Sequence, residues 1–122
     1  MKKILLVLIA VFALCLSISA VDSTHDYLAK AIASSVGDEP FVVRVHYGEM
    51  LLNRVKSADY PDNLRSVCAE LGINITRKTP TDSDFRAAAA ALADLDFCGG
   101  ALNAKRRKAS ENALRLYDWY FY

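Results

Sequence analysis

Apolar residues recur at helical spacing over residues 24–36, and this periodicity predicts an amphipathic helix there. Its apolar positions are Leu28, Ala29, Ile32, Ala33 and Val36. Asp22 or Ser23 can cap the start of this helix, and Asp26 suits its first turn. Gly37 follows the last apolar position, where a glycine commonly ends a helix.

A second apolar stripe predicts a helix over residues 41–56. The stripe consists of Val42, Val45, Leu52 and Val55, and it is widened by Met50 and Leu51. Pro40 comes immediately before it, and proline is favoured in the first turn of a helix. Asp38 and Glu39 therefore lie near the N-terminus of this helix, where the helix dipole and unpaired N–H groups stabilise ionised carboxylates. We predict that these two acids cap the helix.

Two shorter apolar patterns predict further helices over residues 62–71 and 83–97. The first carries Leu64, Val67, Cys68 and Leu71, and the second carries Phe85, Ala88, Leu92 and Leu95. Gly72 is expected to end the first of these helices, and Gly99–Gly100 the second. The polar stretch between the two helices is predicted to be a connection with a short extended piece over residues 73–76.

Aromatic side chains dominate residues 114–122, a composition typical of a β-strand. A single strand is not stable alone, so we expect it to pair with another segment, for which residues 101–104 are a candidate. Residues 105–108 form the basic run KRRK, which either contacts an anionic polymer or is a solvated charged segment. Together these patterns predict a single, mostly helical α+β domain with a small C-terminal β element.

The N-terminus has the order of a secretory signal peptide over residues 1–20. A basic start is followed by thirteen consecutive apolar residues at positions 4–16 and then by small residues suited to cleavage near Ser19 or Ala20. The apolar run is shorter than the roughly 20 residues that a membrane-spanning helix needs. We predict a secreted domain over residues 21–122, the alternative being an uncleaved membrane anchor.

The charge of the predicted domain is close to neutral. The chain has 15 basic and 14 acidic residues, and Lys2 and Lys3 belong to the predicted signal peptide. This balance gives no support to nucleic acid as a partner. Cys68 and Cys98 remain after cleavage and either pair in an oxidising compartment or are two buried thiols. The cysteines and histidines show no spacing typical of a zinc site, so neither a metal nor a cofactor is predicted.

The stretch from Leu28 to Val67 resembles a known family of enzymes. "LAKAIASSVGDEPF", followed after a short interval by "LNRVKSADYPDNLRSV", is similar to the catalytic domain of the SleB-type cell wall hydrolases, the spore cortex-lytic enzymes. The matching elements are Glu39–Pro40, Leu52–Val55, Tyr60–Pro61 and Val67. The resemblance implies a lysozyme-like fold, a monomer, and peptidoglycan glycan strands as the ligand. It also implies cleavage by a lytic-transglycosylase or muramidase type of mechanism.

The chemistry of that family depends on one glutamic acid at the end of the first helix. The acid is protonated and donates to the glycosidic oxygen, which requires a pKa raised by an apolar pocket. At the matching position this chain has Ser35, whose hydroxyl cannot replace a carboxylic acid as proton donor at neutral pH. The chain is therefore read as a domain that cleaves or formerly cleaved glycan strands. The alternative is a non-catalytic peptidoglycan-binding or structural wall protein.

Glu49 is the carboxylate that stands out elsewhere, because it lies within an otherwise apolar helix. His46 precedes it by three residues and Asn53 follows by four, so the three side chains share one helix face. One interpretation is a relocated acid, Glu49, with His46 and Asn53 as substrate-binding neighbours. The other interpretation, which we favour, is a solvent-facing stripe. Glu39 remains a further candidate acid, although its expected capping role favours the ionised form.

Overall fold

The structure, a computed structural model, describes residues 24–93, 97–106 and 114–122. The predicted signal peptide over residues 1–20 lies outside this part of the chain, as do Leu95 and the second half of the KRRK run. Within the described ranges, no helix combines the length and apolar character needed to cross a lipid bilayer.

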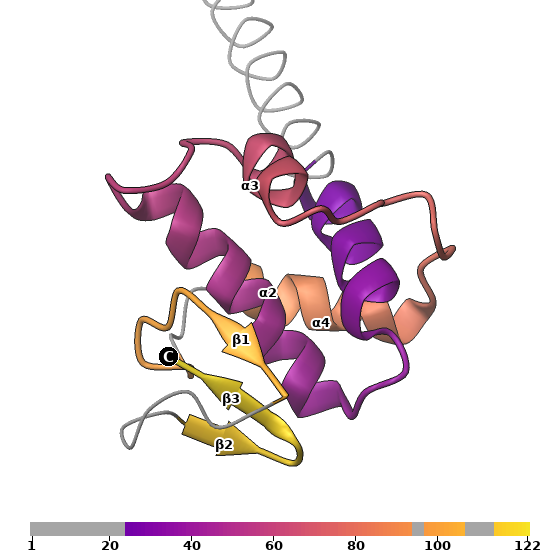
Figure 1. Ribbon diagram of the computed structural model, residues 1–122. Coiled ribbons are helices and arrows are strands. Elements are labelled where there is room, and N and C mark those ends of the chain that lie inside the picture. The colour runs from indigo at the N-terminus through magenta and orange to yellow at the C-terminus, as the bar shows by residue number, and fades with distance from the viewer. Residues whose placement is uncertain (1–23, 94–96, 107–113) are drawn as a thin grey trace, which may run out of the picture.

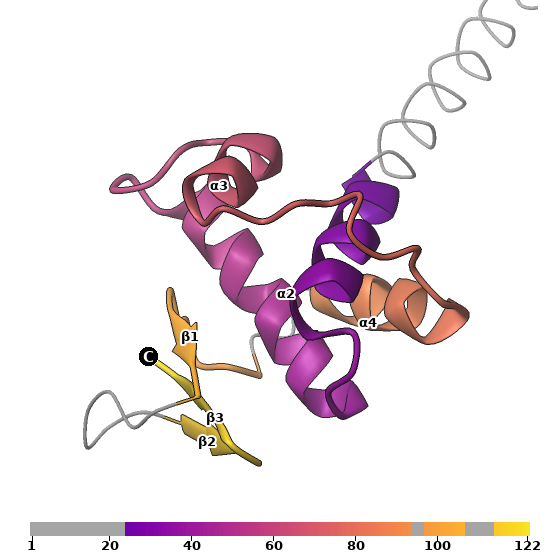
Figure 2. The ribbon, with the colours of Figure 1, turned by 45° about the vertical axis from the view of Figure 1, so that its right-hand side comes forward.

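One helix, α2, forms the centre of the fold (Figure 1). It spans Phe41–Lys56, the range that the apolar pattern predicts. A helix over residues 24–36, α3 (Leu64–Glu70), α4 (Asp82–Leu92) and a small C-terminal sheet surround it (Figures 1 and 2). Among the labelled elements, α2 packs most extensively against α4.

Burial of α2 extends well beyond the single stripe that the sequence predicts. Its buried residues are Val43, Val45, His46, Tyr47, Gly48, Glu49, Met50, Leu51 and Arg54. Val42, Leu52 and Val55, which belong to the predicted stripe, are only partly buried. The reason is that helices and the sheet cover α2 from several sides, so that polar residues become buried together with apolar ones.

The helix over residues 24–36 buries the apolar face that its periodicity predicts. The five apolar residues of that face are each at most 2% exposed. Gly48 lets α2 approach both this helix and α4 closely. A Cβ atom added there would lie 2.9 Å from the Cβ of Ala91 and 3.0 Å from Cδ1 of Ile32. A glycine is therefore required where the three helices meet.

The helix α3 is shorter than predicted. It spans Leu64–Glu70, because the side chain of Asn63 caps it by accepting a hydrogen bond from the backbone N–H of Ser66 at 2.8 Å. Gly72 follows with a φ of 71°, as expected for a helix-ending glycine. The extended piece predicted over residues 73–76 is wrong, since this segment contains turns and no strand.

The helix α4 begins at Asp82 and ends at Leu92. Thr81 and Asp84 form a reciprocal capping box at its start. The predicted end at Phe97 is wrong, because Phe97 lies in a turn and is 54% exposed. Gly99–Gly100 follow in that turn with positive φ values of 62° and 76°.

Residues 114–122 form a hairpin rather than the single strand predicted. Strand β2 (Leu114–Leu116) turns at Tyr117, which has a φ of 54°, into strand β3 (Trp119–Phe121). Strand β1 (Ala104–Lys105) pairs with the other side of β3, which gives an antiparallel sheet of order β1-β3-β2. The expected pairing with residues 101–104 is confirmed at its C-terminal end, since Ala104 lies opposite Phe121. The mostly helical α+β fold with a small C-terminal sheet is confirmed.

Candidate functional site

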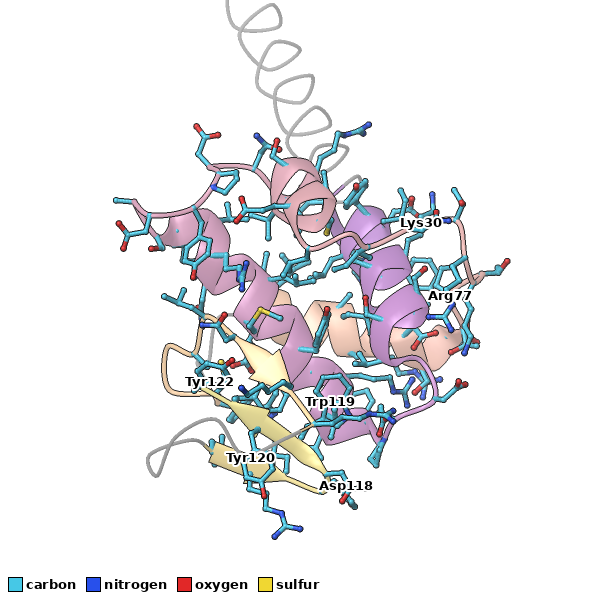
Figure 3. The ribbon with its side chains drawn as sticks, in the orientation of Figure 1. Lys30, Arg77, Asp118, Trp119, Tyr120 and Tyr122 are labelled. Carbon is cyan, nitrogen blue, oxygen red and sulfur yellow. The ribbon has the colours of Figure 1, made fainter. Side chains whose placement is uncertain are left out.

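Ser35 lies in the last turn of the 24–36 helix and lines a polar cavity of about 180 Å³. Residues 33–39 form one wall of this cavity, and Arg77, Lys78 and Arg106 form the rest. Figure 3 shows Arg77 beside the C-terminal part of the helix. The position at which the family resemblance expects a glutamic acid is therefore open to a small cavity.

The side chain of Ser35 also faces α2. It takes part in a hydrogen bond with the hydroxyl of Tyr47, a residue only 8% exposed. Burial raises the pKa of the Tyr47 hydroxyl, and the hydrogen bond with Ser35 partly opposes that rise. Tyr47 in turn packs edge-on against Trp119, with ring centroids 6.1 Å apart. Ser35 is thus held between the cavity and an aromatic pair.

Asp38 and Glu39 do not cap α2, and that prediction is wrong. The N-cap residue is Pro40, and no side chain makes a capping hydrogen bond there. Asp38 instead pairs with Lys78 at 2.6 Å, and Glu39 pairs with Arg106. The hydrogen bond from Lys78 holds the pKa of Asp38 below its usual range. Both acids are therefore bound to cations at the cavity, which does not suit a protonated general acid.

Arg77 closes the same cavity from the connection between α3 and α4. Its guanidinium donates a hydrogen bond to the carbonyl oxygen of Ser34 at 3.0 Å. That carbonyl belongs to the last turn of the helix, where backbone acceptors lack helical partners. Among the described residues, Arg77 forms no ion pair with a carboxylate.

Glu49 and His46 are buried, so the predicted solvent-facing stripe on α2 is wrong. Glu49 is 3% exposed and His46 is 6% exposed, while Asn53 is half-buried. The three side chains do share a function in the fold, because each contacts the C-terminal part of the chain. Surrounding elements, which helical periodicity alone does not reveal, cover this face of α2.

The contacts of these three residues hold the turn at residues 97–101 and the sheet against α2. Glu49 Oε2 accepts a hydrogen bond from the backbone N–H of Cys98 at 3.1 Å. Asn53 donates to the carbonyl oxygen of Ala101 at 3.0 Å. The ring of His46 packs on Phe121 with centroids 5.5 Å apart, and its Nδ1 lies 2.7 Å from the carbonyl oxygen of Val42. None of the three lines the Ser35 cavity.

Cys68 and Cys98 are thiols in the structure and are not joined by a disulfide. Cys68 is completely buried on α3, and burial raises the pKa of its thiol to about 11. Cys98 is 4% exposed, and its sulfur lies 3.4 Å from the side-chain nitrogen of Asn53. The sequence left two alternatives open, a disulfide or two separate buried thiols, and the structure contains the two separate thiols.

The chemistry available at the Ser35 cavity is electrostatic rather than acid–base. Its lining includes three cations and two ion-paired carboxylates, and Ser35 itself cannot act as a general acid. Elsewhere in the described ranges, no three histidine, cysteine, aspartate or glutamate side chains gather in a way that would hold a metal ion. The arrangement can bind and orient a ligand through charge and hydrogen bonds.

The sequence did not indicate that three cations surround Ser35. Arg77 and Lys78 lie in a polar connection that shows no pattern typical of a site. Arg106 belongs to the KRRK run, for which contact with an anionic polymer was one of two interpretations, but nothing in the sequence linked that run to Ser35. Their approach to residues 33–39 depends on how the α3–α4 connection and the segment after β1 pack. A weak signal was the excess of basic residues in otherwise polar loops.

Comparison with known proteins gives a structural likeness only. The sequence matches no protein-family model and no characterised protein sequence at a significant level. The structure is similar to the crystal structure of the catalytic domain of the Bacillus cereus SleB protein, with a TM-score of 0.65 and 20% identity over 82% of this chain and 89% of that one. It is also similar to the catalytic domain of SleB from Bacillus anthracis, a germination-specific lytic transglycosylase, with a TM-score of 0.64 and 21% identity over 80% and 92%. The chain therefore has the fold of the SleB catalytic domain, as the sequence resemblance predicts.

Proposed function

We propose that this protein is a secreted domain that acts at the cell wall and takes peptidoglycan glycan strands as its ligand. The observation that carries the proposal is the likeness to SleB catalytic domains, which spans 82% of the chain and 89% of a SleB domain. The predicted signal peptide supplies the route to the wall. The ligand is assigned from the family resemblance, since the fold by itself does not specify a function.

The local geometry at Ser35 favours glycan binding without cleavage. Both carboxylates that line the cavity are in ion pairs. The position at which the family resemblance expects the proton donor is occupied by Ser35. Cleavage of a glycosidic bond by this family's mechanism needs a carboxylic acid within hydrogen-bonding reach of the leaving oxygen. The protein is then a domain that formerly cleaved glycan strands and now binds them.

Retained cleavage is the second candidate function, and one observation favours it. Glu49 is buried, and its Oε1 has no hydrogen-bond partner among the described residues. A carboxyl group is the chemical type that general acid catalysis of this reaction requires. However, a glycan in the Ser35 cavity would not contact Glu49, so cleavage by Glu49 requires that the glycan bind elsewhere on the protein.

A peptidoglycan digestion and binding assay tests the proposal. We expect the secreted protein to cosediment with purified sacculi and to release no soluble fragments. Ser35→Glu should introduce glycan cleavage, detected as anhydro-sugar or reducing products by mass spectrometry, while the size-matched Ser35→Gln should not. If neither the natural protein nor Ser35→Glu binds or cleaves sacculi, the proposed ligand is wrong. If the natural protein cleaves and Glu49→Gln abolishes that activity, the second candidate function replaces the first.

A further inference from the structure

We infer that the Ser35 cavity binds an oxyanion, namely a phosphate or carboxylate group carried by a cell-wall polymer. This inference rests on the proposed function and deepens it, because it specifies the chemical group that reaches the position of the missing acid. The shared chemistry is a compact, negatively charged group with several oxygen acceptors.

Three cations from two distant segments converge on the cavity. Arg77 and Lys78 come from the α3–α4 connection, and Arg106 follows β1. Guanidinium groups match phosphate and carboxylate oxygens through parallel N–H donors, and an ammonium group adds a point charge. The cavity of about 180 Å³ is large enough for such a group.

The cavity lining holds three cations and two carboxylates, so one positive charge is in excess. Asp38 pairs with Lys78 and Glu39 with Arg106. Arg77 forms no ion pair among the described residues, and its charge acts on Asp38 without direct contact. The side chain of Asp38 is 89% exposed, and an ion pair of such exposure contributes little free energy. An incoming oxyanion can therefore compete with Asp38 for Lys78 in addition to binding Arg77.

One hydrogen-bonding group of the cavity lining also lacks a partner. Ser34 lines the cavity, and its buried Oγ has no partner in the described part of the chain. Buried polar groups are normally paired, so this hydroxyl is available as a donor to an acceptor in the cavity.

The C-terminal end of the 24–36 helix disfavours a bound anion, because its carbonyl groups carry partial negative charge. Arg77 removes much of this obstacle by donating to the Ser34 carbonyl oxygen at 3.0 Å. The short side chain of Ser35 adds no charge of its own. The space that a glutamate at this position would fill is thus available to a negative group from the ligand.

Titration of the secreted protein with inorganic phosphate tests the inference. Binding is followed by NMR chemical shifts or calorimetry at constant ionic strength, with chloride as the reference anion. We expect saturable binding, weakened about tenfold or more by Arg77→Gln, since a hydrogen bond between charged groups is lost. The matched control is Arg115→Gln, an exposed arginine that lies over Tyr120 on the sheet and does not line the cavity. Equal weakening by the two changes, or no saturation, would overturn the inference.

Two changes at Ser35 provide an independent test. Ser35→Glu places a carboxylate inside the cavity and should abolish phosphate binding, while the uncharged Ser35→Gln should retain a measurable part of it. Phosphate affinity that is unchanged in Ser35→Glu contradicts the inference. Acetate in place of phosphate reports on carboxylate binding by the same variants.

Binding to sacculi separates the two sources of the oxyanion and separates this inference from the proposed function. Sacculi stripped of phosphate-containing polymers are compared with intact sacculi. Loss of Arg77-dependent binding on stripping assigns a polymer phosphate, and its persistence assigns a carboxylate of the peptidoglycan peptides. Sacculus binding that is independent of Arg77 overturns the inference and leaves the proposed function standing. Phosphate binding without any sacculus binding overturns the proposed function and, with it, the cell-wall polymer as the source of the oxyanion.

Discussion

The carboxylate of Glu49 on α2 accepts a hydrogen bond from the backbone N–H of Cys98 at 3.1 Å, joining residues 49 positions apart. This bond fixes the turn at residues 97–101 on the central helix, next to the strand β1 that follows it. A hollow of about 530 Å³ lies between that turn and the C-terminal sheet, lined in part by Phe97 and Tyr122. Glu49 therefore acts in this structure as an anchor for the segment between α4 and the sheet.

Glu49→Ala should destabilise the domain by about 1–3 kcal/mol, because the buried N–H of Cys98 loses its acceptor. Glu49→Gln keeps an oxygen acceptor and should cost less. Chemical denaturation followed by fluorescence or circular dichroism measures the free energy of unfolding. The control is Glu70→Ala, an exposed position at the end of α3, which should change stability by less than about 0.5 kcal/mol. Equal stability of the two alanine variants would contradict the anchoring role.

Asp84 should be essential for the packing of α4 on α2. Its Oδ1 accepts a hydrogen bond from Arg44 at 3.0 Å, and the side chains of the pair are 4% and 12% exposed. Asp84→Ala removes this partner and the capping box with Thr81 together, so we expect a loss of about 3–5 kcal/mol. Asp82→Ala, at an exposed position in the same helical turn, is the control and should cost less than about 1 kcal/mol. Similar denaturation midpoints for the two variants would rule out the buried ion pair as a major contributor.

Gly48→Ala should destabilise the domain by about 1–3 kcal/mol, although alanine is the better helix former. The added methyl group would lie 2.9 Å from the Cβ of Ala91, which cannot move without α4. Ala91→Gly in the same chain removes that atom and should restore part of the loss. A double-mutant cycle of unfolding free energies measures the coupling. Additive effects of the two changes would show that the helices do not meet at Gly48.

The two cysteine thiols should resist alkylation in the folded protein. Cys68 is completely buried, and its thiol is protonated at pH 8 because its pKa is raised to about 11. The thiolate is the reactive form, so both burial and the raised pKa slow the reaction. For the protein without residues 1–20, and so without Cys15, intact mass after iodoacetamide treatment without reductant should show no adduct in native buffer and two adducts in denaturant. The absence of adducts in denaturant would instead show that Cys68 and Cys98 pair in the secreted protein.

Local periodicity determined the elements of this fold to different degrees. The range 41–56 was predicted without error, because Pro40 and a long apolar pattern define that helix. The end of α4 was predicted five residues too late, since nothing in the local sequence excludes a helix up to Phe97. The hairpin at residues 114–122 was read as one strand because Tyr117 and Asp118 lack the Asn-Gly or Asp-Gly signal of a tight turn.

The candidate site was only half predictable from sequence. The resemblance located Ser35 at the end of a helix, and the structure places it at a cavity there. The roles of the nearby acids were wrong, because Asp38 and Glu39 pair with Lys78 and Arg106 instead of capping α2. Ion pairs between segments 40 and 67 residues apart cannot be deduced from local helix-capping rules.

The sequence by itself determined the helical order of the chain, the likeness to the SleB-type domain and the serine at the acid position. Only the tertiary structure decided which polar side chains are buried and which cations surround Ser35. The physical reason is that helical periodicity identifies a single apolar face of a helix, whereas α2 is covered by other elements on several sides. Burial of Glu49 and convergence of Arg77, Lys78 and Arg106 both arise from long-range packing, which no local pattern contains.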